Sequence, residues 1–281
     1  MITNPNVKIN LGLNVLRKRE DGFHDLETLF VPYFGIKDTL EIITGDDFST
    51  TSAMLFAKYN GVEQGLVQGI SEDGKLMITI AREEGVDWDP LKDLTAKAYF
   101  ILAEDFNLPP VKIFLEKTSP VGAGLGGGSA DAAFALKMLN ELCGLGLSDQ
   151  KLAEYASRLG SDCAFFIYNR PMIGEGRGEI LTEWPVDISG YDLQVLTPEG
   201  VSVSTKDAYS GFRPHLPEVP LRDALARPVD EWQGVLVNDF EETVFAKYPE
   251  LDAIKRSLYE CGAVYASMSG SGSALFALFK A

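Results

Sequence analysis

Hydrophobic and polar residues alternate along residues 5–16, near the start of the chain. A period of two places alternate side chains on opposite faces of an extended strand, so the pattern predicts a half-buried strand. One face carries five aliphatic residues: Val7, Ile9, Leu11, Leu13 and Val15. The other face carries an unusually polar set: Lys8, Asn10, Gly12 and Asn14.

Further elements follow in clusters of strands and clusters of helices. A charged turn over residues 17–25 leads to expected strands at 27–34 and 39–43. Apolar spacing with start and stop signals predicts four helices: 93–106 capped by Asp93, 129–143 closed by Gly144, 148–159 capped by Ser148, and 251–259. Four more strands are expected at 111–116, 193–196, 263–268 and 274–279, the last two paired. Residues 44–75 are weakly patterned, and we interpret them as edge strands and loops.

This clustering indicates an α+β fold, because strands and helices would alternate more strictly in an α/β chain. The chain has 281 residues, which fits one large domain or two closely packed ones. No repeat or low-complexity linker is visible. We place a boundary near residue 150, giving domains over residues 1–150 and 151–281.

The net charge of −16 excludes some classes of partner. Proteins that bind nucleic acids or anionic membranes need a basic surface, so we expect neither kind of partner. An anionic substrate would need a local positive patch inside this negative envelope. The sequence leaves the oligomeric state open.

Three widely spaced cysteines, Cys143, Cys163 and Cys261, form no CxxC pair. Their odd number fits inert buried thiols in a reducing cytoplasm. No secretory signal is visible at the N-terminus. The charge-free stretch 261–279 is too rich in glycine and serine for a membrane span, so we expect a cytoplasmic protein.

The strongest local signal is a glycine-rich segment over residues 118–136 that follows an expected strand and opens an expected helix. Glycines allow close backbone approach and positive φ, and the start of a helix offers backbone N–H groups to phosphate oxygens. The segment lacks the Gly-Lys-Ser/Thr of a Walker A loop and is not a clean dinucleotide fingerprint. The alternative is a flexible turn without a ligand.

The string PVGAGLGGGSADAA, residues 120–133, resembles the phosphate-binding loop of the GHMP kinases, a superfamily that includes galactokinase, homoserine kinase and mevalonate kinase. This resemblance implies a two-domain α+β fold with mixed sheets and an active site in the cleft between the domains. It also implies ATP as co-substrate, with Mg²⁺ arriving on the ATP, since the sequence shows no cluster of metal ligands. The implied ATP-binding residues are Pro120, Gly122, Gly124, Leu125, Gly126, Gly127, Gly128 and Ser129. We assign Asp131 no role, because a carboxylate beside phosphate repels it unless a cation intervenes or its side chain turns away.

A second set of motifs narrows the resemblance. Lys8–Leu11 and Asp21–His24, with shorter matches at 160–162, 176–179, 200–202, 238–241 and 268–273, resemble the GHMP kinases that phosphorylate the 2-hydroxyl of a cytidine-diphosphate-bearing sugar alcohol in non-mevalonate isoprenoid biosynthesis. Residues 270–273 could form a tight hairpin, or their small side chains could allow close backbone approach to substrate phosphates or to the active-site helix. Asp93 stands where the family commonly has asparagine, which could alter contacts near the adenine or simply improve the helix cap.

The resemblance also implies roles for single residues. Lys8 and Asp162 would be catalytic, at a common point near the acceptor hydroxyl. The implied substrate-binding residues are Asn10, Phe23, His24, Thr205 and Tyr209. Without the resemblance, the sequence alone would indicate that Lys8 is a solvated strand lysine, that Asp162 is a helix N-cap and that His24 is a surface residue. His215 we interpret as a surface residue.

Two alternatives remain. The chain could be a GHMP kinase for homoserine, a mevalonate-type acid or a sugar, although none of these acceptors has a nucleobase to stack on an aromatic ring. It could also be a catalytically silent nucleotide-binding protein on the same scaffold.

Overall fold

The computed structural model describes residues 1–44 and 49–281. Contacts divide these into two compact units. Unit 1 comprises residues 1–7, 33–121 and 126–168, and unit 2 comprises residues 8–32, 122–125 and 169–281. Each unit draws on separate segments, whereas the predicted domains are continuous. The division at residue 150 therefore stays a prediction.

Unit 1 contains a five-stranded sheet in the order β1-β4-β7-β6-β5. Strands β6 and β7 pair in parallel, and the other neighbours pair antiparallel. The bounds of these strands are Ile2–Thr3 for β1, Thr39–Thr44 for β4, Leu66–Ile70 for β5, Leu76–Arg82 for β6 and Val111–Lys117 for β7.

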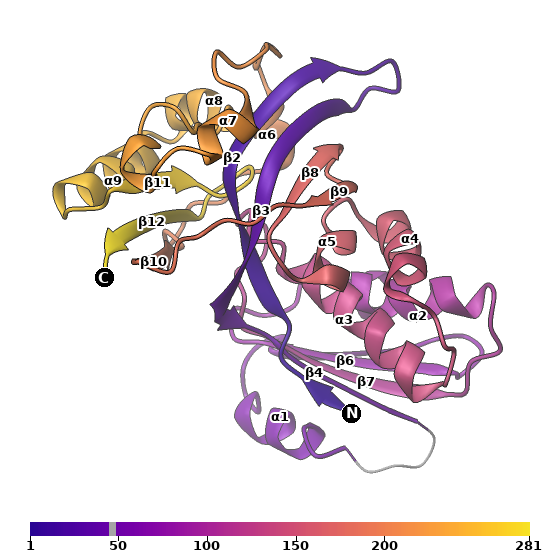
Figure 1. The fold of residues 1–281 in the computed structure, drawn as a ribbon. Helices are drawn as coiled ribbons and strands as arrows, with labels where there is room; N and C mark the ends of the chain where they lie inside the picture. Colours follow the sequence, from indigo (N-terminus) through magenta and orange to yellow (C-terminus); the bar gives the residue numbers. More distant parts are fainter. Residues whose placement is uncertain (45–48) are drawn as a thin grey trace. The chain divides into compact units, whose positions relative to one another are not determined.

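Helices lie on both faces of this sheet (Figure 1). One face carries α2 (Leu94–Ala103), α3 (Gly127–Leu142), α4 (Asp149–Leu159) and α5 (Cys163–Tyr168), and the other carries α1 (Ser52–Lys58). A 3₁₀ turn, η1 (Pro90–Lys92), precedes α2. Strand β5 confirms an edge strand within residues 44–75, but α1 shows that the interpretation of that segment was incomplete.

Unit 2 contains most of a sheet in the order β2-β3-β8-β9 and a second sheet in the order β10-β12-β11. The bounds of these strands are Asn6–Lys18 for β2, His24–Lys37 for β3, Met172–Gly176 for β8, Ile180–Glu183 for β9, Tyr191–Leu196 for β10, Tyr265–Met268 for β11 and Leu275–Lys280 for β12. The helical segments are α6 (Thr205–Tyr209), α7 (Leu221–Leu225), η2 (Val229–Glu231), α8 (Phe240–Lys247) and α9 (Pro249–Glu260). Aliphatic side chains of β2, α8, α9 and β12 form a shared core that includes Leu13, Val244, Leu258 and Leu275.

Strand β2 is buried on both faces, which corrects the prediction of a half-buried strand. Lys8 and Asn10 are each 2% exposed and Asn14 is 4% exposed. Buried polar groups need hydrogen-bond partners, and the neighbouring strand β3 supplies one: Asn10 donates to the Thr28 hydroxyl at 3.0 Å. The polar face of β2 is therefore buried and hydrogen-bonded within the protein, and it is not a solvated edge.

The helix starts confirm the predicted caps. The Asp93 carboxylate accepts from the Thr95 backbone N–H at 2.8 Å, and the Ser148 hydroxyl accepts from that of Lys151 at 3.3 Å. Strands β7, β10, β11 and β12 lie where strands were predicted, and β11 and β12 pair antiparallel. The α+β class is thus confirmed. Within residues 1–44 and 49–281, every helix is too short or too polar to serve as a membrane span.

Candidate active site

Lys8 of β2 is bound to the glycine-rich segment inside unit 2. Its ammonium donates to the Asn10 side-chain oxygen at 2.5 Å and to the Gly124 carbonyl at 2.7 Å. Its backbone N–H donates to the Leu125 carbonyl at 2.9 Å. The structure therefore brings together three residues that the sequence singled out, Lys8, Asn10 and Gly124, and it excludes the solvated-lysine interpretation. Gly122, by contrast, is exposed, and a Cβ added there would meet no atom within 4 Å.

Gly124 can only be glycine at this position. Its φ is +77°, and an added Cβ would lie 2.1 Å from the Ser269 carbonyl oxygen. Ser269 in turn donates its hydroxyl to the Gly124 carbonyl at 3.0 Å. The turn that joins β11 to β12 is therefore a hairpin and a close neighbour of the glycine-rich segment, while its approach to substrate phosphates or to the active-site helix stays a prediction.

Ser269 was not singled out in the sequence analysis. It belongs to the motif Met268–Ser273, which resembles a motif of the family but does not indicate which residue Ser269 contacts. Its partner Gly124 is 145 residues away in the chain. Only the fold brings these two residues into contact.

Unit 1 carries the helix that the glycine-rich segment opens. Gly126 has φ +72° and immediately precedes α3, whose first residues are Gly127, Gly128 and Ser129. The first backbone N–H groups of any α-helix lack partners within the helix, and the helix dipole makes that end positive. The start of α3 thus has the chemistry of a phosphate site. Pro120 is half-buried at the other end of the segment.

Asp162 lies directly before α5, beside the start of α3. Burial raises the pKa of the Cys163 thiol, and the nearby Ser129 hydroxyl opposes this rise. A Cβ added at Gly160 would lie 3.2 Å from the Cys163 sulfur and 4.0 Å from the Ser129 hydroxyl oxygen. Within unit 1, the turn that carries Asp162 is thus a neighbour of Ser129. Asp162 belongs to unit 1 and Lys8 to unit 2, and their joint action stays a prediction.

The predicted cytidine-binding residues are partly assembled in unit 2. The His24 ring stacks on the Tyr209 ring, with centroids 4.4 Å apart and planes 18° apart. A base inserted between two stacked rings needs about twice that spacing, so a cytosine that binds the covered face of Tyr209 must displace His24. Burial, with a smaller contribution from Lys18, lowers the pKa of His24. Thr205 opens the short helix α6 that Tyr209 closes.

Phe23 has a different partner. Its side chain is 52% exposed, and the Arg177 guanidinium lies 5.0 Å from its ring centroid, a cation–π distance. One face of Phe23 is thus occupied by Arg177, a residue of the 176–179 motif to which the sequence analysis gave no individual role.

The two aspartates left open by the sequence are now explained. A cation accompanies Asp131: its carboxylate is buried and lies 2.6 Å from the Lys117 ammonium. Asp93 caps α2 and also accepts from the Trp88 indole N–H at 3.0 Å, which supports the improved-cap explanation.

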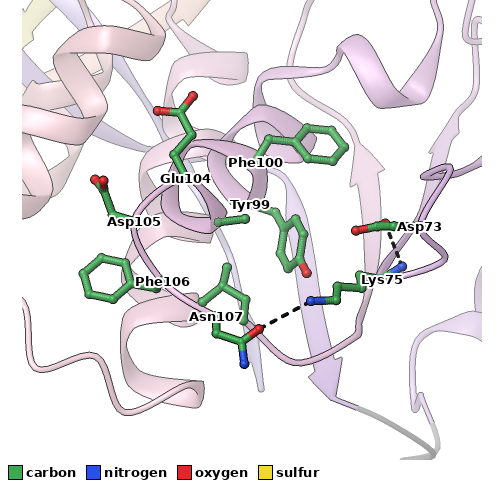
Figure 2. Close-up of a pocket in the computed structure, with 10 residues that line it drawn as sticks. Asp73, Lys75, Tyr99, Phe100, Glu104, Asp105, Phe106 and Asn107 are labelled. Carbon is green, nitrogen blue, oxygen red and sulfur yellow. Dashed lines mark hydrogen bonds between the residues drawn. The ribbon is translucent and has the colours of Figure 1, made fainter.

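One pocket of about 440 Å³ opens on unit 1, at the end of α2 (Figure 2). Its lining includes Lys75, Tyr99, Phe100, Glu104 and Asn107. No predicted site residue lines this pocket, so its location does not support the predicted active site.

The cysteines correct one expectation. Only Cys163 is buried, which raises the pKa of its thiol to about 12, while Cys143 is half-buried and Cys261 is exposed. Among the residues that the structure describes, no three His, Cys, Asp or Glu side chains are grouped so as to hold a metal ion.

Comparisons with known proteins identify the family of this chain. The family model "GHMP kinases N terminal domain" matches residues 93–170, and "GHMP kinases C terminal" matches residues 221–281. The chain is 46% identical over 280 residues to the 4-diphosphocytidyl-2-C-methyl-D-erythritol kinase of Bacteroides fragilis, covering 100% of this chain and 92% of that protein.

Two solved structures extend the likeness. A crystal structure of 4-(cytidine 5'-diphospho)-2C-methyl-D-erythritol kinase has a TM-score of 0.73 and 29% identity, covering 99% of this chain and 90% of that chain. A homoserine kinase from Cytophaga hutchinsonii shares the fold, with a TM-score of 0.62 and 17% identity, covering 99% of this chain and 86% of that chain. This chain therefore belongs to the 4-diphosphocytidyl-2-C-methyl-D-erythritol kinases of the GHMP kinase superfamily.

Proposed function

We propose that this chain transfers the γ-phosphate of ATP to the 2-hydroxyl of 4-diphosphocytidyl-2-C-methyl-D-erythritol, releasing ADP, in non-mevalonate isoprenoid precursor biosynthesis. Its family makes it an ATP-dependent phosphotransferase. The observation that carries the proposal is the buried Lys8 ammonium held against the carbonyl of Gly124 in the glycine-rich segment. That contact fixes a positive charge at the segment whose composition suits phosphate.

Asp162 orients the acceptor hydroxyl and takes its proton late in the reaction. A carboxylate is a far weaker base than an alkoxide, so it cannot remove this proton in advance. Phosphoryl transfer has a loose transition state in which positioning and charge stabilisation dominate, and the proton becomes acidic only as the new P–O bond forms. The place of Asp162 beside Ser129 and the start of α3 supports this role.

Lys8 stabilises the negative charge of the phosphoryl group in transit. Its ammonium is oriented by Asn10 and Gly124, so little reorganisation is needed when charge develops. Asn10 lies two residues from Lys8 on the same face of β2 and helps to orient the acceptor hydroxyl. Ser269, which also contacts the Gly124 carbonyl, keeps this part of the site compact.

The start of α3 binds the ATP phosphates. The backbone N–H groups of Gly127, Gly128 and Ser129 point from the positive end of a 16-residue helix. Pro120, Gly122, Leu125 and Gly126 set the path of the segment that leads there. Mg²⁺ comes with ATP and supplies charge neutralisation on the β and γ phosphates.

The cytidine is recognised by aromatic residues of unit 2. Tyr209 and Phe23 offer ring faces for stacking, and His24 can donate and accept hydrogen bonds at the edge of the base. Because the His24 ring covers one face of the Tyr209 ring, the base competes with His24 for that face. Thr205 lies one helical turn before Tyr209 and lines the same pocket.

A substrate panel tests the proposal. We expect ADP release with 4-diphosphocytidyl-2-C-methyl-D-erythritol and a far lower kcat/KM for 2-C-methyl-D-erythritol 4-phosphate, which lacks the cytidylyl group. Homoserine, mevalonate and galactose should give no ADP above background. Equal kcat/KM for the cytidylated and non-cytidylated compounds would contradict the proposed substrate, and ATP binding without turnover of any acceptor would favour a silent nucleotide-binding protein.

A further inference from the structure

A buried charged cluster lies at the end of β7 in unit 1. The Lys117 ammonium is 2.5 Å from the Asp38 carboxylate and 2.6 Å from that of Asp131. Lys117 is 5% exposed, and the two aspartates are each 1% exposed. The three residues come from the end of β7, the junction of β3 and β4, and helix α3. Buried ion pairs contribute little net stability compared with apolar residues of similar size, so the cluster calls for another reason.

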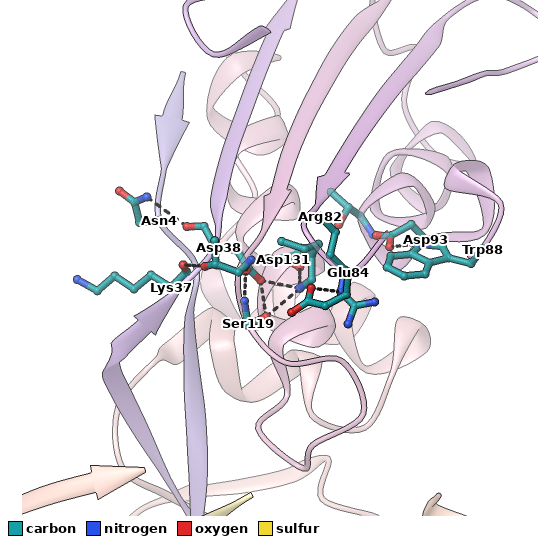
Figure 3. Close-up of polar contacts among 12 residues, drawn as sticks. Asn4, Lys37, Asp38, Arg82, Glu84, Trp88, Asp93, Ser119 and Asp131 are labelled. Atoms are coloured by element: carbon teal, nitrogen blue, oxygen red, sulfur yellow. Dashed lines mark hydrogen bonds and ion pairs between the residues drawn. The ribbon is translucent and has the colours of Figure 1, made fainter. Parts of the chain in front are cut away.

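The cluster fixes the entry of the glycine-rich segment. One oxygen of Asp38 accepts from the backbone N–H groups of Thr118 and Ser119 at 2.6 and 2.7 Å. Its other oxygen accepts from the Ser119 hydroxyl at 2.6 Å, and that hydroxyl accepts from Lys117 at 3.0 Å. Figure 3 shows Asp38, Ser119 and Asp131 turned toward one another. The first two residues after β7 are thereby held by charge-assisted hydrogen bonds.

The same cluster also holds the start of α3. A Cβ added at Gly127 would lie 2.3 Å from the Ser119 hydroxyl oxygen and 3.4 Å from the Lys117 ammonium. The first turn of α3 therefore packs directly on the cluster. Asp131 is four residues after Gly127, on the same face of the helix, and its ion pair with Lys117 holds the second turn.

One atom of the cluster is not satisfied. The second carboxylate oxygen of Asp131 is buried without a hydrogen-bond partner among the described residues. Burial raises the pKa of Asp131 well above its ordinary value although Lys117 opposes this, whereas Lys117 and Ser119 hold the pKa of Asp38 below its ordinary value against burial. A buried polar atom without a hydrogen-bond partner lowers the stability of the folded protein. The cluster is therefore better explained by its positioning of α3 than by a gain in stability.

We propose that Lys117 is a positioning residue for ATP. Through Asp38, Ser119 and Asp131 it fixes both the entry and the exit of the glycine-rich segment, and so aims the first backbone N–H groups of α3. The proposal rests on the proposed function, because it assumes that those N–H groups bind ATP phosphates. Lys117 itself does not touch the nucleotide.

Substitution of Lys117 by methionine tests the role, with a matched control on the same strand. Glu116 precedes Lys117 in β7, its side chain points to the other face of the sheet, and it is also a buried member of an ion pair, with Lys58 at 2.6 Å. We would measure the Kd for ATP by calorimetry, the KM for both substrates and the Tm of the full chain. Lys117→Met should weaken ATP binding by about tenfold or more, which corresponds to about 1.4 kcal/mol, with less than about a twofold change in the KM for the acceptor.

The control separates positioning from plain stabilisation. Glu116→Gln should lower the Tm and leave the Kd for ATP unchanged. If both variants lose stability and neither changes the Kd for ATP, Lys117 is only structural and the inference is wrong. If the wild-type chain itself fails to bind ATP, the proposed function is wrong. This outcome is distinguishable from a purely structural role of Lys117, in which the wild type and both variants bind ATP equally well.

If Lys117→Met fails to fold, a second pair of variants tests whether the cluster positions the start of α3. Gly127→Ala places a methyl group 2.3 Å from the Ser119 hydroxyl oxygen and should weaken ATP binding by about tenfold. Adding Ser119→Gly removes the clashing atoms, so the double variant should bind ATP more tightly than Gly127→Ala alone. A double variant that binds no better than Gly127→Ala would overturn the claim that the cluster sets the start of α3.

Discussion

At the scale of single residues, the candidate chemistry depends on which side chains and carbonyls the fold places beside each candidate residue. Lys8 would be an ordinary strand lysine without Asn10 and Gly124 as its hydrogen-bond acceptors. Asp162 would be an ordinary residue before a helix without Ser129 nearby. These neighbours turn common side chains into candidates for phosphoryl transfer.

Replacing Asp162 with asparagine keeps the size of the side chain and removes its basicity. Loss of a general base typically costs about 10²-fold or more in rate, so kcat should fall by at least about that factor. The KM values for ATP and for the cytidylated substrate should stay within a few fold. Steady-state ADP release measures both quantities, and a variant that retains half of the wild-type kcat would remove Asp162 from the catalytic role.

Replacing His24 with alanine should act on substrate recognition. The substitution removes both the ring that covers Tyr209 and the hydrogen-bonding groups expected at the base edge. The KM for the cytidylated substrate should rise more than the KM for ATP. A fluorescence titration or initial rates with each substrate varied would show this, and equal changes in the two KM values would count against His24 as a cytidine-binding residue.

At the scale of elements, local signals predicted those helices and strands whose ends the sequence marks. Asp93 and Ser148 cap their helices as expected. Helix α1 was missed because it is seven residues long, lacks a side-chain cap, and is held by Leu55, which shares a core cluster with Ile43 of β4 and with Phe114 of the remote strand β7. The contact of Gly124 with Ser269 and the cluster around Lys117 were missed for the same reason, since both join residues far apart in sequence.

The segment before α1 is anchored by Glu41 of β4, and this anchor gives a pH-dependent prediction. Burial alone would raise the pKa of Glu41, but hydrogen bonds from Ser49, Thr50 and Thr51 lower it from 4.5 to about 2. Because the folded pKa is below the unfolded one, the stabilisation is present above pH 4.5 and is lost as the pH falls toward 2.

Glu41→Gln should therefore lower the free energy of unfolding at neutral pH by about 1.5–3 kcal/mol, the range for a hydrogen bond to a charged group. The difference between the wild type and the variant should shrink between pH 4.5 and pH 2. Urea unfolding of both proteins across this range measures it. A difference that stays constant with pH would show that the charge of Glu41 is not what stabilises the segment.

At the scale of the whole molecule, the sequence motifs are distributed over two units that each combine separate parts of the chain. Lys8 and the aromatic cytidine-binding candidates belong to unit 2, while Ser129 and Asp162 belong to unit 1. The glycine-rich segment contributes residues to both units. The resemblance to a known family supplied candidate residues, but the sequence could not indicate which of them share a unit.

The central claim is that Lys8 and Asp162 act in one phosphoryl-transfer step. A double-mutant cycle in kcat for the cytidylated substrate, with Lys8→Met, Asp162→Asn and the double variant, tests it most directly, with single-turnover rates for the slow variants. Residues that act in the same step have strongly non-additive effects, so the double variant should be about as slow as the slower single variant. Two fully multiplicative losses, or a Lys8→Met variant with near wild-type kcat, would contradict the account.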